Sequence, residues 1–268
     1  KRLSALAMNA TFEEICALLW LGDQAQDRRL FSSNQMWTVP KTCSAAGKTG
    51  HDPLDLFQEW LPRMAAADPS QFNKTLPVVA ECGARIIKAF AGLLAGSTKK
   101  HSKSIPIAAI LAGAWKSKLL RKREQIRLLD TCLVLCAEHE LNASAFTARC
   151  VASTGASLYA SVNAGLCALR GPRHGGATLA VEEVMEMAAK TGDPTEVVAR
   201  YLKRGQSLLG FGHRIYRGFD PRAAMIFQLL DAIPKASKEM RRARQLIHAM
   251  ELGTGLAPNL DFALVLAL

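Results

Sequence analysis

The sequence predicts an all-α protein, and three kinds of observation support that class. Apolar residues recur at helical spacing along nearly the whole chain of 268 residues. Helix start and stop signals bracket several of these stretches. No long alternating strand or Asn-Gly hairpin interrupts them. The chain is long enough for one large domain or two moderate ones, each with a sizeable core.

The first helix is predicted in ATFEEICALLWLG, residues 10–22. Thr11 is placed to cap it, and Glu14 is placed to reach back in a capping box. The apolar stripe that follows consists of Phe12, Ile15, Cys16 and Leu19. Gly22 then ends the helix.

Later segments carry the same signals. In DPTEVVARYLKRG, Asp193 is the expected N-cap and Pro194 the first helical residue. Glu196 is expected to close a capping box, and Gly205 to stop the helix. Two stretches rich in Gly, Ser and Lys, residues 43–53 and 96–106, are predicted to be surface loops.

The composition argues against a membrane or secreted protein. The longest apolar runs, such as IPIAAILAGAW at 105–115, are too short to span a bilayer. The first residues lack the apolar core of a signal peptide. We therefore expect no membrane partner and a cytoplasmic location, in a bacterial cytosol rather than a mitochondrial matrix.

The seven cysteines are odd in number and lie in mostly apolar surroundings, which indicates free thiols in a reducing compartment. Cys132, Cys136 and His139 have a spacing reminiscent of metal ligands. Because no second Cys or His pair completes a tetrahedral set, we expect no metal site.

The formal net charge of +11 favours anionic partners, which include nucleic acids and phosphorylated or carboxylated metabolites. Two basic clusters, at 116–127 and 235–245, lack interleaved aromatic residues and carry apolar residues at helical spacing. We interpret them as solvated helix faces. A nucleic-acid-binding module stays an alternative that rests on charge alone.

His174 lies in the break between two predicted helices. Arg-Gly-Pro at 170–172 must end the preceding helix, and two glycines follow the histidine before the next one begins. Glycines beside a polar side chain let a ligand approach the backbone closely. An ordinary helix–helix turn with a partly exposed histidine explains the same pattern.

The segment GFGHRIYRGFDPRA, residues 210–223, gathers more polar chemistry than a core would use. Asp220 is a natural N-cap and Pro221 the first helical residue, so Arg222 lies in the first turn. The free N–H groups of that turn and the Arg222 guanidinium would face one region, beside His213. That arrangement suits a carboxylate. A capped helix with solvated arginines is the alternative.

Four motifs, in order, resemble the signature of the citrate synthase family: HELNAS, ALRGPRHGGA, GFGHRIYRGFDPRA and PNLDF (258–262). The N-terminal stretch ATFEEICALLWLG is also similar to the family, whereas 25–125 resembles it loosely. The resemblance implies a helical two-domain homodimer. The large domain would cover 1–175, the small mobile domain 176–261, and 262–268 would begin a return to the large domain.

The resemblance also implies an activity, the condensation of acetyl-CoA with oxaloacetate followed by hydrolysis to citrate and CoA. Acetyl-CoA would be a cosubstrate, with no tightly bound cofactor. Carried over by motif, Asp261 would be the base and His174 the donor to the enolic oxygen, and His213 would act on the ketone. The expected binding residues are His139 and Arg222 for the oxaloacetate carboxylates and Arg217 for CoA phosphate.

The chain departs from the family pattern at several points. Arg173 stands where an apolar residue is common, and Thr178 where Asn is common. The chain stops at Leu268, just after Asp261, and also begins abruptly, so we expect it to be clipped at both ends. Two alternatives remain open: a 2-methylcitrate synthase that uses propionyl-CoA, and a non-catalytic relative that binds CoA or oxaloacetate.

Overall fold

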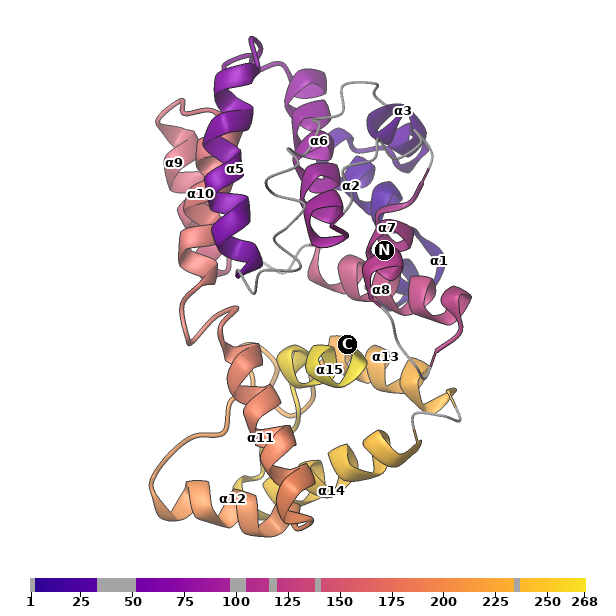
Figure 1. Ribbon diagram of the computed structural model, residues 1–268, viewed down its shortest axis with the longest axis vertical. Helices are drawn as coiled ribbons and strands as arrows, with labels where there is room; N and C mark the ends of the chain where they lie inside the picture. Colours follow the sequence, from indigo (N-terminus) through magenta and orange to yellow (C-terminus); the bar gives the residue numbers. More distant parts are fainter. Residues whose placement is uncertain (1–2, 33–51, 97–104, 116–119, 138–140, 234–236) are drawn as a thin grey trace. The chain divides into compact units, whose positions relative to one another are not determined.

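The computed structural model describes residues 3–32, 52–96, 105–115, 120–137, 141–233 and 237–268 (Figure 1). Every regular element among them is helical. Their β pairing is limited to an isolated antiparallel bridge between Phe211 and Pro258. The all-α prediction is therefore confirmed. Within the same residues, no helix combines the length and the apolar character needed to cross a membrane.

The chain divides into two compact units. Unit 1 comprises Lys1–Lys118 and Lys122–Arg170, and unit 2 comprises Leu119–Arg121 and Gly171–Leu268. The division after Arg170 coincides with the Gly-Pro that ends a helix in the sequence. The predicted limits of the large and small domains, at 175 and 176, stay predictions, as does the assignment of 262–268 to the large domain.

Unit 1 is built from helices that pack around apolar side chains. Its elements are α1 (Leu3–Asn9), α2 (Phe12–Leu21), the 3-10 turn η1 (Gln24–Gln26), α3 (Asp27–Phe31), α5 (Pro53–Ala67), α6 (Leu76–Leu94), α7 (Ile107–Ala114), α8 (Lys122–Cys136), α9 (Ala143–Ser153) and α10 (Leu158–Leu169). Helices α5, α6 and α10 share one core, in which Leu61, Ile86 and Tyr159 are buried.

Helix α2 follows its sequence signals closely. The Thr11 Oγ accepts the Glu14 N–H at 3.3 Å, and the Thr11 N–H donates to the Glu14 carboxylate at 2.8 Å, which completes the capping box. Gly22 adopts a φ of 76° at the C-terminus. The predicted stripe is wrong at Leu19, which is 46% exposed, whereas its other three members are buried.

A buried polar cluster joins three helices of unit 1. Asp68, the C-cap of α5, accepts bonds from Arg85 of α6 and from the Tyr159 hydroxyl of α10, each at 2.7 Å. All three residues are buried. Because each charge has a hydrogen-bonded partner, the cluster links the end of α5 to α6 and to the start of α10 without leaving an isolated charge in the core.

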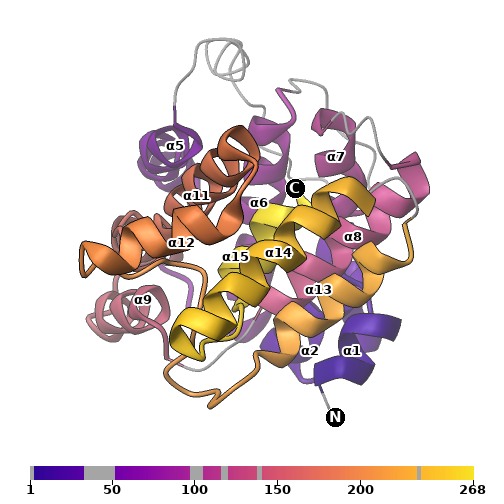
Figure 2. The same cartoon turned by 90° about the horizontal axis from the view of Figure 1, so that it is seen from below.

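Unit 2 contains five helices among its described residues: α11 (Ala177–Thr191), α12 (Pro194–Lys203), α13 (Pro221–Asp231), α14 (Ser237–Thr254) and α15 (Leu260–Ala267). Figure 2 shows α14 beside α15, and both helices contribute to one core. The buried side chains at its centre are Val181, Val197, Leu246 and Phe262. The Asp193 cap and the Gly205 stop at φ 66° are confirmed at α12. The predicted capping box is wrong, because the Glu196 carboxylate accepts from Arg200 at 2.9 Å instead.

From Ser237 on, where the structure describes it, the second basic cluster lies on a solvated face of α14, as predicted. Arg241 and Arg242 are exposed, while Met240, Ala243 and Leu246 are buried on the other side of the helix. Part of the first cluster, 116–119, lies outside the described residues, as do most of the expected loops at 43–53 and 96–106.

The described cysteines are free thiols, but only Cys16, Cys82 and Cys132 are buried. The expected apolar surroundings therefore hold for those three.

Candidate active site

The loop that begins at Gly210 is paired with the segment that leads into α15. The Gly212 N–H donates to the Ala257 carbonyl at 2.8 Å, and the Asn259 N–H donates to the Gly210 carbonyl at 2.9 Å. Gly210 has a φ of 90°, and a Cβ there would lie 2.6 Å from Val181 Cγ2. Only glycine fits this close approach. The pairing brings His213 and Asp261, which follow the two paired segments, to one end of unit 2.

Asp261 lies in the first turn of α15. Asn259 caps this helix: its side-chain oxygen accepts the N–H of Asp261 at 3.0 Å and that of Phe262 at 3.4 Å. A carboxylate in the first turn of a helix is stabilised by the backbone dipoles. The Asp261 side chain is therefore held at a helix start, with its own N–H satisfied by the cap.

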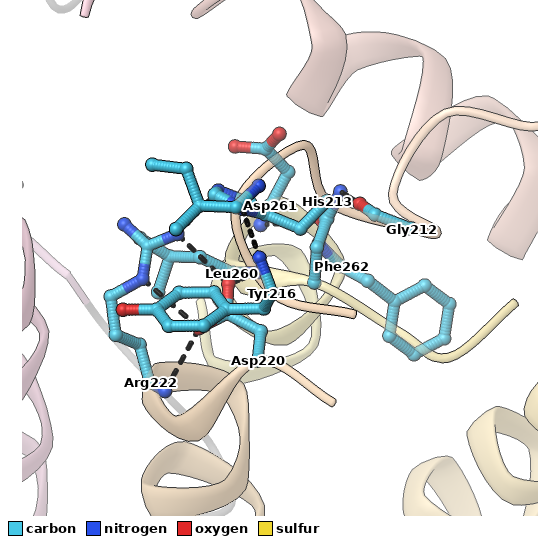
Figure 3. Close-up of polar contacts among 10 residues, drawn as sticks. Gly212, His213, Tyr216, Asp220, Arg222, Leu260, Asp261 and Phe262 are labelled. Carbon is cyan, nitrogen blue, oxygen red and sulfur yellow. Dashed lines mark hydrogen bonds and ion pairs between the residues drawn. The ribbon is translucent and has the colours of Figure 1, made fainter. Parts of the chain in front are cut away.

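The ring of His213 is oriented by the backbone that follows it. Its Nδ1 accepts the N–H of Ile215 at 3.1 Å and that of Tyr216 at 3.3 Å. A ring nitrogen that accepts N–H bonds carries no proton, so the imidazole is neutral and carries its proton on Nε2. The Tyr216 ring lies against the imidazole, with the ring centroids 4.9 Å apart (Figure 3).

Arg222 is buried and paired with Asp220. The Asp220 carboxylate accepts bonds from Arg222 Nε at 3.0 Å and Nη2 at 2.8 Å, and it also caps α13 through the Arg222 N–H. The same carboxylate accepts the Leu260 N–H at 3.1 Å, which links α13 to the start of α15. The Arg222 guanidinium stacks over the Tyr216 ring, 5.8 Å from its centroid.

This pairing modifies the sequence prediction for Arg222. Asp220 and Pro221 begin α13 as predicted, and Arg222 lies in its first turn. The Arg222 N–H, however, is taken by the cap, and the Nε and Nη2 edge of the guanidinium is taken by Asp220. The expectation that both would be free for a ligand is wrong, because the N-cap aspartate is long enough to reach the side chain two residues on.

Arg222 and His213 also approach each other directly. Arg222 Nη2 lies 3.2 Å from His213 Nε2. Since Nε2 carries the imidazole proton, two hydrogen-bond donors face each other at this distance. A ligand oxygen placed beside them would accept from both. The pair therefore has the chemistry of a site for a carbonyl or carboxylate oxygen.

The pKa of the Asp261 carboxyl is raised. Burial is the main cause, and the nearby Asp220 carboxylate adds to it, whereas the positive charge of Arg222 acts in the opposite direction. Arg222 of α13 therefore lies close enough to the Asp261 carboxyl to affect its pKa. A raised pKa makes this carboxylate a stronger base than an ordinary exposed aspartate.

His174 lies in the turn that precedes α11, as predicted. Its N–H donates to the Gly171 carbonyl and its carbonyl accepts the Ala177 N–H, both at 2.9 Å. The two glycines at 175 and 176 complete the turn, and Thr178 donates its hydroxyl to the Gly175 carbonyl at 2.9 Å. The side chain of His174 is partly exposed.

Arg217 and His139 are the two other predicted site residues. Arg217 is exposed on the loop between His213 and Asp220, and its role stays a prediction. His139 lies outside the described residues. No group of three or more His, Cys, Asp or Glu side chains in the described part of the chain could hold a metal ion.

Sequence reasoning missed the contributions of Asn259 and Tyr216. An Asn before an acidic residue and an apolar run is an N-cap signal, so Asn259 could have been found as the cap of α15. Its second bond, from the side-chain nitrogen to the Gly212 carbonyl at 3.0 Å, joins residues 47 apart and leaves no local signal. The stacking of Tyr216 has no local signal either.

Comparison with known proteins places this chain in a family. The family model for the citrate synthase C-terminal domain matches residues 2–268. The chain is 27% identical over 290 residues to 2-methylcitrate synthase 1 of Corynebacterium glutamicum, which covers 96% of this chain and 73% of the relative. It is 30% identical over 223 residues to the citrate/2-methylcitrate synthase of Bacillus subtilis, covering 78% and 59% respectively.

A solved structure shares the fold. The citrate synthase of the thermophilic archaeon Thermoplasma acidophilum, in a ternary complex with carboxymethyl coenzyme A and oxaloacetate, superimposes with a TM-score of 0.75. The two chains are 24% identical, and the match covers 96% of this chain and 73% of the archaeal one.

Proposed function

The chain belongs to the citrate synthase family, and we propose that it condenses acetyl-CoA with oxaloacetate to give citrate and free CoA. The observation that carries the proposal is the arrangement at one end of unit 2. There, two donors on His213 and Arg222 converge beside the Asp261 carboxyl, whose pKa is raised. That arrangement suits an oxygen-rich electrophile next to a carbon acid.

Oxaloacetate would bind at the two converging donors. Its ketone oxygen would accept the His213 Nε2–H, and a carboxylate would meet the Nη1 and Nη2 end of Arg222, because Asp220 holds the other edge. Both donors are fixed before the ligand arrives. Their hydrogen bonds would strengthen as negative charge develops on the ketone oxygen.

The thioester would bind on the Asp261 side. Asp261 would remove a proton from the methyl group of acetyl-CoA while His174 donates a hydrogen bond to the thioester oxygen, which becomes enolic. The nucleophilic carbon would then form a bond to the ketone carbon of oxaloacetate. His213 would supply a proton to the resulting alkoxide. Water would finally cleave the thioester of the citryl-CoA formed, giving citrate and the CoA thiol.

The remaining roles are proposed from the family resemblance. Arg217, exposed on the same loop as His213, would contact a CoA phosphate, and His139 would bind an oxaloacetate carboxylate. The family uses no tightly bound cofactor, and CoA is a cosubstrate. We propose in addition that the protein is a cytoplasmic homodimer that works in the tricarboxylic acid cycle.

Propionyl-CoA is the second candidate substrate. The Corynebacterium glutamicum relative is named a 2-methylcitrate synthase, and the Bacillus subtilis relative carries both names. The two thioesters differ by one methylene, which is typically worth about 1–3 kcal/mol of discrimination in a pocket. A small change in the pocket would therefore decide between them.

The test is a thiol-release assay on the full-length protein. Oxaloacetate is supplied with acetyl-CoA or with propionyl-CoA, and the two kcat/KM values identify the preferred thioester. Asp261→Asn should lower kcat by a factor of about 1,000 or more while leaving oxaloacetate affinity nearly unchanged. Glu251→Gln, which removes an exposed carboxylate of α14, is the matched control and should turn over normally. Absence of thiol release with both thioesters would overturn the proposal.

A further inference from the structure

The side chain of Asn259 lies between the two halves of the proposed site. Its oxygen accepts the N–H groups of Asp261 and Phe262, and its nitrogen donates to the Gly212 carbonyl at 3.0 Å. The Gly212 carbonyl belongs to the peptide bond that leads into His213. One planar carboxamide therefore bonds to the backbone of the proposed base and to the backbone next to the proposed ketone donor.

We propose that Asn259 is a positioning residue that fixes His213 relative to Asp261. The inference rests on the proposed function, since it concerns those two side chains. Reacting groups must meet within a few tenths of an ångström, and a displacement of about 1 Å can cost about 100-fold in rate. The carboxamide supplies that constraint because its two ends are a fixed distance apart.

The main-chain bonds next to Asn259 do not provide the same constraint. The pairs Gly212–Ala257 and Asn259–Gly210 hold the two segments together, and both are independent of the side chain at 259. They stay intact when that side chain is replaced. Substitution of Asn259 therefore isolates the contribution of the carboxamide.

Three substitutions separate the two functions of the Asn259 side chain, which caps α15 and bonds to the Gly212 carbonyl. Serine caps a helix about as well as asparagine, but it is too short to reach the Gly212 carbonyl while it caps. Aspartate also caps, but it has no donor for that carbonyl and places a second negative charge beside Asp261. Alanine provides neither bond. Serine thus removes only the bond to the Gly212 carbonyl. Aspartate removes that bond and adds a charge, and alanine removes both that bond and the cap.

The experiment measures kcat, KM and thermal unfolding for Asn259→Ser, Asn259→Asp and Asn259→Ala. For Asn259→Ser we expect an unfolding midpoint near that of the wild type and a kcat lower by about 10- to 100-fold. The KM for oxaloacetate should change less than about threefold. Asn259→Asp should in addition move the acid limb of the pH–rate profile upward, because a neighbouring carboxylate disfavours ionisation of Asp261.

The matched control is Asp193→Ala, which removes the N-cap of α12 in the same unit. It should lower the unfolding midpoint about as much as Asn259→Ala and leave kcat unchanged. A wild-type kcat for Asn259→Ser, or equal losses of kcat for the two alanine variants, would overturn the positioning role.

A second readout does not depend on turnover. In protein with ¹⁵N-labelled histidine, the His213 ring should show a protonated Nε2 and an unprotonated Nδ1, and Asn259→Ser should give a mixture of tautomers. Such a change in a protein that releases no thiol would support the positioning of His213 by Asn259, although the proposed function had failed. If the enzyme is active and Asn259→Ser changes neither the His213 signal nor kcat, the positioning role is rejected and the proposed function is not.

Discussion

At the scale of single residues, the Asp220–Arg222 pair determines what the site can bind. Asp220 is 2% and Arg222 6% exposed, so neither charge is solvated by bulk water. Burial alone would raise the pKa of the Asp220 carboxyl, but the hydrogen bonds from Arg222 and Leu260 and the Arg222 charge hold it below its usual range. The carboxylate therefore stays ionised and keeps the guanidinium in place.

Arg222→Lys should weaken oxaloacetate binding while the protein remains folded. Lysine keeps a positive charge for Asp220 but loses the planar fork that meets Asp220 and a ligand carboxylate together. We expect the dissociation constant for oxaloacetate to rise by a factor of about 10 or more, measured by calorimetric titration. Arg217→Ala is the counterpart: it should raise the KM for the CoA thioester and leave oxaloacetate affinity unchanged. Equal effects of the two substitutions on both substrates would contradict the assigned roles.

The raised pKa of Asp261 predicts the acid limb of the pH–rate profile. The proposed base works only when it is ionised, so kcat/KM should fall as the pH drops through the pKa of Asp261. Because burial raises that pKa, the midpoint should lie above about 3.9, the usual value for aspartate. The profile is measured with circular dichroism at each pH to confirm that the protein is folded. A limb at or below pH 3.9 would show that Asp261 is not the group that titrates.

At the scale of elements, local signals predicted the helices better than the contacts between them. The capping box of α2 and the Asp-Pro starts of α12 and α13 could be predicted because each depends on residues within one turn. Leu19 was assigned to a buried stripe on periodicity alone, and the structure leaves it exposed. Periodicity identifies a face of a helix but not how far the covering elements extend.

Gly210 provides a test of the pairing between its loop and α15. An alanine there would need a φ of 90° and would place its Cβ 2.6 Å from Val181 Cγ2. Gly192 is the matched control, since it has a φ of 73° but nothing lies within 4 Å of its Cβ position. Gly192→Ala should cost about 1–2 kcal/mol of unfolding free energy from backbone strain. Gly210→Ala should cost about 1–3 kcal/mol more, because the core is overpacked as well.

Urea unfolding of the two glycine variants measures the difference. Comparable losses for Gly210→Ala and Gly192→Ala would mean that Val181 moves aside without cost. In that case the close approach of the loop to α11 would not stabilise unit 2.

Asp130 makes the stability of unit 1 depend on pH. It accepts the Phe12 N–H at 3.0 Å and so joins α8 to the start of α2. Burial raises its pKa to about 6, and the charges of Glu13 and Glu14 add to the effect. The folded state therefore binds more protons than the unfolded state between about pH 4 and pH 6. The contribution of Asp130 to stability is complete below that window and is lost as the pH rises through it.

Asp130→Asn should remove this dependence, because the amide oxygen still accepts the Phe12 N–H but carries no charge. The free energy of unfolding of the variant, relative to the wild type, should increase from pH 5 to pH 7 and then level off. Urea titrations at four pH values in this range measure the trend. A difference that does not change with pH would mean that Asp130 titrates at its ordinary value.

At the scale of the whole molecule, the fold class and the family could be predicted from the sequence, but the assembly of the site could not. The motif order identified His174, His213, Arg222 and Asp261 as a set. Physical reasoning alone could not bring Asp220 to Leu260 or Asn259 to Gly212, because these partners are 40 and 47 residues apart. The domain limits and the role of His139, which lies outside the described residues, stay predictions.

The whole-molecule prediction concerns cooperation between the two substrates. The proposed oxaloacetate donors, His213 and Arg222, are tied to α15 through Asn259 and through Asp220, and α15 carries Asp261. Oxaloacetate would accept from the two facing donors and would further restrict the motion of the loop between them. An acyl-CoA that binds afterwards would meet Asp261 already held in place. Its binding would therefore cost the protein less conformational entropy.

Such coupling is reciprocal and is typically worth about 1–3 kcal/mol, or about 5- to 150-fold in affinity. Oxaloacetate at saturation should therefore tighten the binding of carboxymethyl-CoA, which cannot react, by a factor in that range. Calorimetric titration of the analogue with and without oxaloacetate measures the factor, and the reverse titration should return the same value. Asn259→Ser should reduce it, because one of the two links to α15 is lost. Identical affinities in the presence and absence of oxaloacetate would show that the two halves of the site bind independently, despite the hydrogen bonds that join them.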